Sequence, residues 1–413
     1  MVAKRNARCV PDDVAEGSLE ALRERNRMRV IDALRHRGTA TRSELARSTG
    51  LSRTTIATLL ADLQSRGLVV ETAEVESRAG GRGRPPALLR LDPSAGTALG
   101  IDFGHRHVRV AVADLSSTLL AEVSAPVEVD TNADEALDLA ASLVERVLDD
   151  AGIERDRVVG AGMGVPGPFD RRRHMINSST ILPGWVGRDP AAELAARIGV
   201  HVEVDNDANL GALGEHRFGA GRGLSDAVYV KLATGIGSGL ILRGALHRGA
   251  TGIAGELGHV QVQPDGVVCN CGGRGCLQTV AAVPALLEAA RAVHGPELTL
   301  SGLMELVAQG DFGARRIVGE AGRAVGRVLS DLCNLVNPEA IIVGGDLSVA
   351  GEPLLAGIRE AIDRHALPGA AEAVEVKAAT LGERAEVLGA LALVIADTVR
   401  LRSAGLASLA SAT

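Results

Sequence analysis

Three stretches near the N-terminus repeat apolar residues at the spacing of an α-helix, over 26–38, 41–50 and 51–67. Arginines occupy the other faces of the first stretch. The apolar positions are Val30, Ile31 and Leu34 in the first stretch and Ile56, Leu59, Leu60 and Leu63 in the third. Three short helices, the last two joined by a predicted four-residue turn, are typical of a helix-turn-helix.

Capping residues mark the ends of these predicted helices. Thr41 and Glu44 have the spacing of a capping box, and Gly50 can end the helix that follows them. Ser52 can cap the third helix. Hydroxyls and an arginine at the start of that helix suit contacts to phosphates and base edges, so it is the predicted recognition helix.

Residues 68–93 alternate in polarity and turn, which predicts a β-hairpin wing after the helices. The arginines of its glycine-rich tip suit the negative potential of a minor groove. The DNA-binding residues predicted for helix and wing are Ser52, Arg53, Thr54, Thr55, Thr58, Arg82 and Arg84. Pro85 and Pro86 close the segment, so residues 19–92 are predicted to form one domain. The alternative is a small helical packing module followed by a linker.

The rest of the chain alternates strand and helix patterns. Residues 97–127 predict a three-stranded meander, and residues 133–152 predict an amphipathic helix ended by a glycine. Further strands end in glycine-rich or acidic turns, and residues 383–399 predict a closing helix. The order strand-strand-strand-helix-strand-helix occurs once before about residue 200 and again after it, which favours an α/β fold with two similar lobes.

The distribution of charge also separates the predicted N-terminal domain from the rest of the chain. The net charge of the chain is −7, but it is unevenly distributed. Residues 19–90 contain 14 arginines against 8 acidic residues, whereas residues 91–413 contain 27 basic against 40 acidic residues. A basic front segment on an acidic body indicates a polyanionic partner. No apolar run approaches the length of a membrane span, and residues 1–17 lack the apolar core of a secretory signal. Five cysteines, three of them clustered, fit a reducing cytoplasm.

The clustered cysteines are candidate metal ligands. Cys269, Cys271 and Cys276 follow a C-x-C-x4-C spacing, and His259 precedes them by ten residues on a glycine-rich stretch. Three thiolates and one imidazole suit Zn²⁺ and leave no open position, so the predicted cofactor is a structural zinc ion. Glu256 lies three residues before His259, so the same loop could present polar groups to a ligand.

The ordered set of motifs is more specific than any one of them. The chain carries GMGVPGP, NDANLGALGE, LATGIGSGL, GELGH, CNCGGRGCLQT and IIVGGDLS in that order, behind the predicted winged helix-turn-helix. From about residue 20 to 400 it thus resembles the ROK family of repressors, open reading frames and sugar kinases. The resemblance implies a two-lobed, actin-like sugar-binding domain over 97–413, a structural zinc and, in many members, ATP-dependent phosphorylation of a hexose.

The resemblance also assigns roles to residues. Asp207 matches the general base of the family's kinases, and Asn206 beside it could hold a neighbouring hydroxyl. Glu256 and His259 would contact the sugar, with the other ring nitrogen of His259 on the zinc. Gln278 stands where the family's sugar kinases have Glu, and it can still bond to a hydroxyl. The alternative for Asn206 and Asp207 is that they only cap the following helix.

One departure bears on catalysis. The family's kinases carry D-x-G-G-T at the first phosphate loop, whereas this chain has Asp102-Phe103-Gly104-His105-Arg106. Bulky side chains there obstruct a phosphate cradle, although Arg106 could attract a phosphate. If ATP and Mg²⁺ bind at all, the nucleotide-binding candidates are Asp102, Gly104, Thr234, Gly235, Gly237, Gly344 and Gly345. The glycine loops could equally be inherited turns.

Three hypotheses follow. The first is a cytoplasmic transcriptional regulator that binds an operator in double-stranded DNA and responds to a monosaccharide or sugar phosphate, as a homodimer or homotetramer without membrane attachment. The second is an ATP-dependent hexose kinase of the ROK family. The third is a constitutive DNA-binding protein whose sugar site has lost its use. The altered loop at 102–106 favours the first hypothesis over the second.

Overall fold

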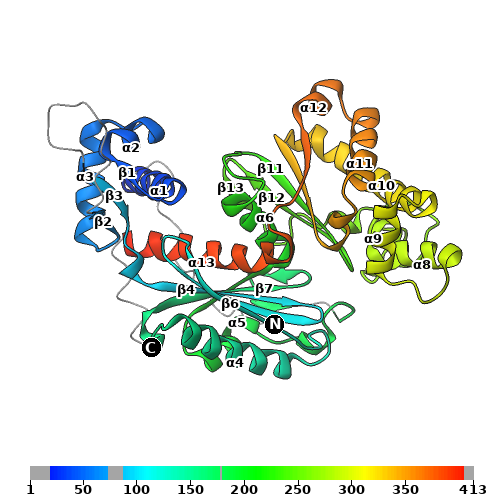
Figure 1. Cartoon of the computed structure of the whole chain (residues 1–413), viewed down its shortest axis with the longest axis horizontal. Helices are drawn as coiled ribbons and strands as arrows, with labels where there is room; N and C mark the ends of the chain where they lie inside the picture. The colour runs from blue at the N-terminus through cyan, green and yellow to red at the C-terminus, as the bar shows by residue number, and fades with distance from the viewer. Residues whose placement is uncertain (1–18, 73–86, 177–178, 404–413) are drawn as a thin grey trace, which may run out of the picture. The chain divides into compact units, whose positions relative to one another are not determined.

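The computed structural model describes residues 19–72, 87–176 and 179–403 (Figure 1). The chain divides into two compact units. One contains the described residues up to Thr97, the hairpin Asp114–Thr118 and the described chain from Ile395. The other contains Ala98–Ala113 and Leu119–Val394. Among the described residues, no helix combines the length and apolar character needed to cross a membrane.

The N-terminal unit is a winged helix. Its elements are α1 (Leu19–Arg37), β1 (Ala40–Thr41), α2 (Arg42–Thr49), α3 (Arg53–Ser65), β2 (Val69–Thr72) and β3 (Leu88–Leu91), followed by the 3-10 helix η1 (Pro93–Ala95). The strands form an antiparallel sheet in the order β1-β3-β2. The apolar residues predicted to share one face are all buried in the core of this unit. The prediction of a winged helix-turn-helix is therefore confirmed.

Local hydrogen bonds define the helix ends of this unit. Thr41 and Glu44 form both bonds of the capping box, and Gly50 ends α2 in the left-handed conformation at φ 67°. The Ser52 hydroxyl accepts the backbone N–H of Thr55 at 3.1 Å and caps α3. The turn between the helices has three residues, 50–52, one fewer than the predicted four. The wing tip with Arg82 and Arg84 lies outside the described residues.

The first sheet of the larger unit has the strand order β10-β7-β4-β5-β6. Helices α4 and α5 lie on one of its faces (Figure 1). The elements are β4 (Thr97–Gly104), β5 (His107–Asp114), β6 (Leu119–Pro126), α4 (Ala133–Ala151), η2 (Arg155–Arg157), β7 (Val158–Val165), β8 (Phe169–Asp170), β9 (Met175–Ile176), η3 (Pro183–Trp185), α5 (Pro190–Ile198) and β10 (Val202–Asn206).

The second sheet has the order β13-β12-β11-β14-β15. In both sheets the five strands follow the order third, second, first, fourth and fifth, which confirms the prediction of two similar lobes. The elements are α6 (Asp207–Phe218), β11 (Ala227–Leu232), β12 (Ile236–Leu242), β13 (Ala245–His247), η4 (Leu257–His259), α7 (Gln278–Ala281), α8 (Val283–His294), α9 (Leu300–Gln309), α10 (Phe312–Val336), β14 (Ala340–Gly344), η5 (Asp346–Ala350), α11 (Glu352–His365), α12 (Pro368–Ala373), β15 (Glu375–Ala378), η6 (Gly382–Arg384) and α13 (Ala385–Ser403).

Helix α13 packs directly against backbone of the first lobe and of α6. A side chain at Gly162 of β7 would overlap the backbone of Ala390, so this glycine is required by a close approach. At Gly389 the helix meets the backbone of Leu210 on α6 in the same way. Small residues on both elements let the backbones approach, so the first part of the predicted closing helix packs closely within the larger unit.

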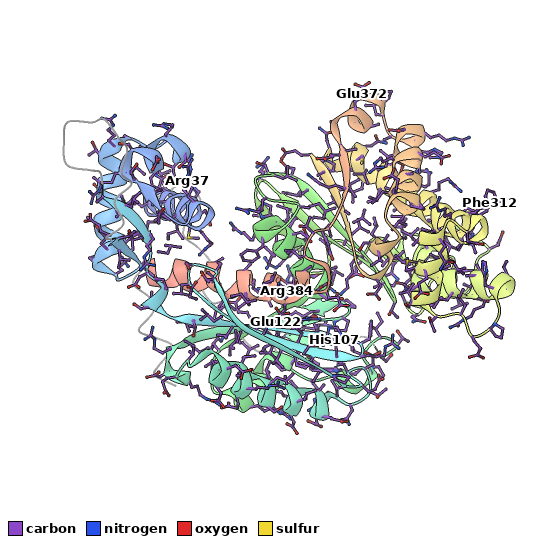
Figure 2. The ribbon with its side chains drawn as sticks, in the orientation of Figure 1. Arg37, His107, Glu122, Phe312, Glu372 and Arg384 are labelled. Carbon is purple, nitrogen blue, oxygen red and sulfur yellow. The ribbon has the colours of Figure 1, made fainter. Side chains whose placement is uncertain are left out.

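Charged side chains hold the start of α13. Glu215 of α6 is fully buried and accepts the backbone N–H groups of Thr380 and Leu381 at 2.9 and 2.8 Å. Glu122 of β6 pairs with Arg384 at 2.8 Å, and both side chains are labelled in Figure 2. These contacts connect α6, the first sheet and the segment that leads into α13.

Candidate functional site

The predicted metal ligands come together. The ligand atoms of His259, Cys269, Cys271 and Cys276 all lie within 4.8 Å of one another. The Sγ atoms of Cys271 and Cys276 are 3.7 Å apart, and His259 Nδ1 is 3.6 Å from the Sγ of Cys269. Tetrahedral zinc, with Zn–S of about 2.3 Å and Zn–N of about 2.0 Å, places sulfur pairs about 3.8 Å apart and sulfur–nitrogen pairs about 3.5 Å apart. These two separations fit such an ion.

The surroundings of the cluster suit thiolates. The backbone N–H of Gly273 donates to the Sγ of Cys271 at 3.4 Å and lowers the pKa of that thiol. The Gln278 amide donates to the Sγ of Cys269 at 3.2 Å. Burial raises the pKa of the Cys276 thiol to about 12, so a cation is needed to hold it as a thiolate near neutral pH. The donor set and its hydrogen bonds together fit a structural metal.

The two ring nitrogens of His259 face different groups. Nδ1 faces the sulfur cluster, and Nε2 lies 3.6 Å from Oε2 of Glu256. Burial lowers the pKa of His259. Burial, with a further contribution from the charge of Asp207, raises the pKa of Glu256. A metal bound at Nδ1 would orient the imidazole so that Nε2 points toward Glu256, whose carboxyl group also interacts electrostatically with Asp207.

Asn206 and Asp207 mark the point where β10 passes into α6. The Asn206 side chain caps α6 by accepting the N–H groups of Ala208 and Asn209, and its amide donates to Gly167 O at 3.0 Å. The capping interpretation therefore describes Asn206 correctly. Asp207 differs, because its Oδ1 accepts the N–H of Ala208 at 2.8 Å whereas its Oδ2 faces a lysine.

That lysine is Lys231 of β11, which was not among the predicted site residues. Its Nζ lies 2.8 Å from Oδ2 of Asp207 and 2.9 Å from Oε1 of Glu386 on α13. Burial disfavours the ammonium, but the two carboxylates outweigh this effect and hold the pKa of Lys231 above its ordinary value. Burial raises the pKa of Glu386. The available signal was a lysine within the otherwise apolar run of residues 227–232, in a chain with three lysines.

Asp102, at the altered loop, also has a basic neighbour. Its Oδ2 lies 3.2 Å from Nε2 of His107, and its Oδ1 is buried without a hydrogen-bond partner among the described residues. The ring of His107, labelled in Figure 2, occupies the space that a side chain at Gly104 would need. A histidine therefore covers the loop where the resemblance expects a nucleotide phosphate.

Close packing accounts for three of the other glycines proposed for nucleotide binding. A side chain at Gly344 would overlap the ring of Tyr229, and one at Gly345 would overlap the backbone of Leu232. Gly237 is packed against Ala208 of α6. Thr234 is exposed, and the nearest atom to a side chain placed at Gly235 would be the amide oxygen of Gln278, at 3.6 Å. The interpretation of these glycines as inherited turns thus has a structural basis.

The start of α3 presents the residues predicted to meet DNA. Ser52, Arg53, Thr54 and Thr58 are exposed, and Thr55 is half-buried. The hydroxyl of Thr58 donates to the carbonyl of Thr54 at 3.1 Å, and that of Ser52 serves as the helix cap. Arg53 and Thr54 therefore remain the side chains best placed for contacts to a partner.

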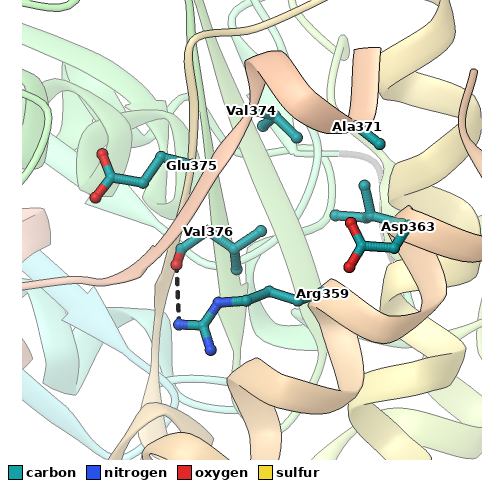
Figure 3. A pocket seen from close by; sticks show the side chains of 7 residues that line it. Arg359, Asp363, Ala371, Val374, Glu375 and Val376 are labelled. Carbon is teal, nitrogen blue, oxygen red and sulfur yellow. Dashed lines mark hydrogen bonds between the residues drawn. The ribbon is translucent and has the colours of Figure 1, made fainter. Parts of the chain in front are cut away.

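A separate cavity of about 350 Å³ lies between α11 and β15 (Figure 3). Its lining residues are Arg359, Ile362, Asp363, Ala371, Val374, Glu375 and Val376. Arg359 donates to the carbonyl of Val376 at 3.2 Å across one side. None of the predicted site residues lines it, so we assign it no part in the site.

Comparison with protein families identifies the class. Residues 98–397 match the ROK family, and residues 24–83 match the MarR family. The chain belongs to the ROK family, with an N-terminal winged helix of the MarR type.

Similar proteins include both regulators and kinases. The xylose repressor of Caldicellulosiruptor bescii is 28% identical over 92% of this chain and 98% of its own length. The glucokinase of Thermotoga maritima is 35% identical over 72% of this chain and 96% of its own length. Among solved structures, a ROK family transcriptional regulator described as a homolog of the Escherichia coli MLC protein superposes with a TM-score of 0.76. It has 25% identity over 92% of this chain and 98% of that chain.

Proposed function

We propose that this protein is a sugar-responsive transcriptional regulator that binds operator DNA through its winged helix. The observation that supports this most strongly is the combination of an exposed Arg53-Thr54 start of α3 with a ROK domain on the same chain. The xylose repressor is similar to this chain over nearly its whole length, whereas the glucokinase is similar over 72% of this chain.

The effector is a sugar recognised around the start of α6 and the metal-braced loop. Asn206, Asp207, Glu256, His259 and Gln278 offer the paired donors and acceptors that a polyol needs. Zinc, held by His259 and the three cysteines, is the structural cofactor and orients the imidazole. The regulator acts as a homodimer or homotetramer, so its operator has two half-sites spaced by whole turns of DNA.

The proposal is tested by sequencing genomic DNA fragments that the purified full-length protein retains, with and without a panel of monosaccharides. A small set of enriched sites with two-fold symmetry, whose retention changes with one sugar, supports it. Binding that follows only salt concentration, with no preferred sequence, refutes it.

A second candidate is an ATP-dependent sugar kinase, favoured by the 35% identity to a glucokinase and by the presence of Asp207. Asp207 would be its catalytic base, with ATP and Mg²⁺ as cofactors. The ring of His107 at Gly104 and the ion pair of Asp207 oppose this candidate. A coupled ADP-release assay over a hexose panel decides, since turnover no greater than that of Asp207→Ala rejects the kinase.

A further inference from the structure

Lys231 is held between two carboxylates, of which Asp207 is the more exposed. The side chains of Lys231 and Asp207 are 21% and 16% exposed, whereas that of Glu386 is 7% exposed. A small molecule that arrives at the start of α6 can therefore touch Asp207 and the edge of Lys231. Glu386 lies beneath and engages the ammonium from the protein side at 2.9 Å.

Both oxygens of Asp207 already accept a hydrogen bond. The N–H of Ala208 donates to Oδ1 and the ammonium of Lys231 donates to Oδ2, each at 2.8 Å. An ionised carboxylate has about four acceptor positions, so it can still accept bonds from sugar hydroxyls. Taking up a proton would replace a charge-assisted bond to Lys231 with a contact between an acid group and an ammonium, which opposes a role as a base.

The charge around Lys231 does not favour an anion. The ammonium interacts with Asp207, Glu386 and Asp102, so one cation faces three carboxyl groups. A phosphate ester next to these groups meets like charge, and its repulsion is strengthened where the surroundings are partly buried. An uncharged polyol meets no such repulsion and can use the acceptors of Asp207.

We propose that Lys231 determines the specificity of the site. Its ammonium holds Asp207 as a hydrogen-bond acceptor for an uncharged monosaccharide, and Glu386 neutralises that ammonium so that it does not attract a phosphate. The inference rests on the proposed function and names the effector class that the function leaves open. A sugar phosphate is excluded as effector, and bound sugar is not phosphorylated.

The test measures binding by calorimetry on the full-length protein. The probes are D-glucose, D-xylose and D-mannose, each compared with its terminal phosphate ester. Lys231→Met removes the ammonium. Glu386→Gln keeps the ammonium but removes the negative charge of its more buried partner, with little change of side-chain shape. The pair Lys377 and Glu375 of β15, 2.9 Å apart, provides the controls Lys377→Met and Glu375→Gln.

We expect the unmodified protein to bind one free sugar at least 100-fold more tightly than its phosphate ester. Lys231→Met should weaken free-sugar binding at least tenfold. Glu386→Gln should strengthen ester binding at least tenfold, a gain that loss of structure cannot produce. The β15 controls should change neither affinity.

Two results overturn the inference while leaving the proposed function intact. One is ester binding as tight as sugar binding in the unmodified protein. The other is a sugar that binds normally, with affinities for sugar and ester that neither Lys231→Met nor Glu386→Gln alters. If the unmodified protein binds no sugar and no ester, the proposed function and the inference both fail.

Discussion

The Nζ of Lys231 lies 2.8 Å from Oδ2 of Asp207, which joins a central strand of the second sheet to the first residue of α6. The resemblance to sugar kinases gives Asp207 the role of a general base. In this chain it belongs to a partly buried ion pair that continues to Glu386 on α13. An aspartate held in this way is a hydrogen-bond acceptor with a charged neighbour, which is the arrangement on which the proposed sugar site rests.

Glu386 should make stability depend on pH. Burial raises its pKa in the folded protein above the ordinary value of 4.5, so the folded state binds a proton more tightly than the unfolded state. The stability from this group is present below pH 4.5 and is lost as pH rises through the raised pKa. The advantage of Glu386→Gln over the unmodified protein should therefore grow as pH rises from about 4.5.

Chemical denaturation at pH 4, 5, 6 and 7 measures this difference in the free energy of unfolding. Glu375→Gln, on the surface pair of β15, is the control and should show no such trend. A stability difference that shrinks with rising pH would show that the pair with Lys231 dominates over burial.

Arg53→Ala should weaken operator binding. The side chain is exposed at the start of α3, where a contact to a base or phosphate contributes about 1–3 kcal/mol. If the contact is to a phosphate, the slope of log affinity against log salt should also fall by about one. Fluorescence anisotropy at several salt concentrations measures both quantities.

Arg316→Ala on α10 removes the same charge from an exposed pair with Glu320 and serves as the control. Equal loss of affinity in both variants would indicate that only net charge matters, and would remove the recognition helix from the proposal.

Removal of one thiolate should release the metal. Cys271→Ser replaces an exposed cysteine whose Sγ lies 3.7 Å from that of Cys276, and it should abolish stoichiometric zinc and weaken sugar binding at least tenfold. The winged helix should melt as in the unmodified protein, because the cluster lies in the other unit. Zinc content, calorimetry and thermal melting provide the three measurements.

Cys333→Ser alters a buried cysteine of α10 outside the cluster and should retain the zinc. Unchanged sugar affinity in zinc-free Cys271→Ser would separate the metal from sugar recognition.

Gly162→Ala should destabilise the larger unit, because its methyl group would overlap the backbone of Ala390 on α13. Forcing extra volume into a packed core costs about 1–3 kcal/mol, and a backbone clash belongs at the upper end. Gly369→Ala has no atom within 4 Å of the added carbon and is the matched control. Equal unfolding free energies for the two variants would show that the sheet and helix separate easily.

The features that the sequence predicted best are those determined by residues close together in the chain. The capping box of Thr41 and Glu44 and the apolar stripe of α3 depend on residues a few positions apart, so the winged helix followed from them. Each strand and helix pattern of the larger segment is also local, and the repeated order of these patterns predicted two similar lobes. The cysteine spacing brought three metal candidates onto one loop, and the structure places their ligand atoms together.

The ion pairs of Lys231 were not predictable in this way. Asp207, Lys231 and Glu386 come from three elements far apart in the chain, and no periodicity connects them. The glycines were ambiguous for a related reason. Gly344 fits a nucleotide loop by sequence, but its need for glycine comes from the ring of Tyr229, which only the folded chain brings near.

Helix α6 begins at Asp207 and carries Glu215 about two turns later. Glu215 holds the backbone of Thr380 and Leu381, just ahead of α13, through hydrogen bonds of 2.9 and 2.8 Å. The backbone hydrogen bonds of α6 and the two bonds of Glu215 thus form one continuous connection from Asp207 to the 380–381 backbone. The helix that carries Asp207 is therefore also a structural support for the segment that leads into α13, so a substitution at Glu215 would remove an anchor of that segment without touching Asp207.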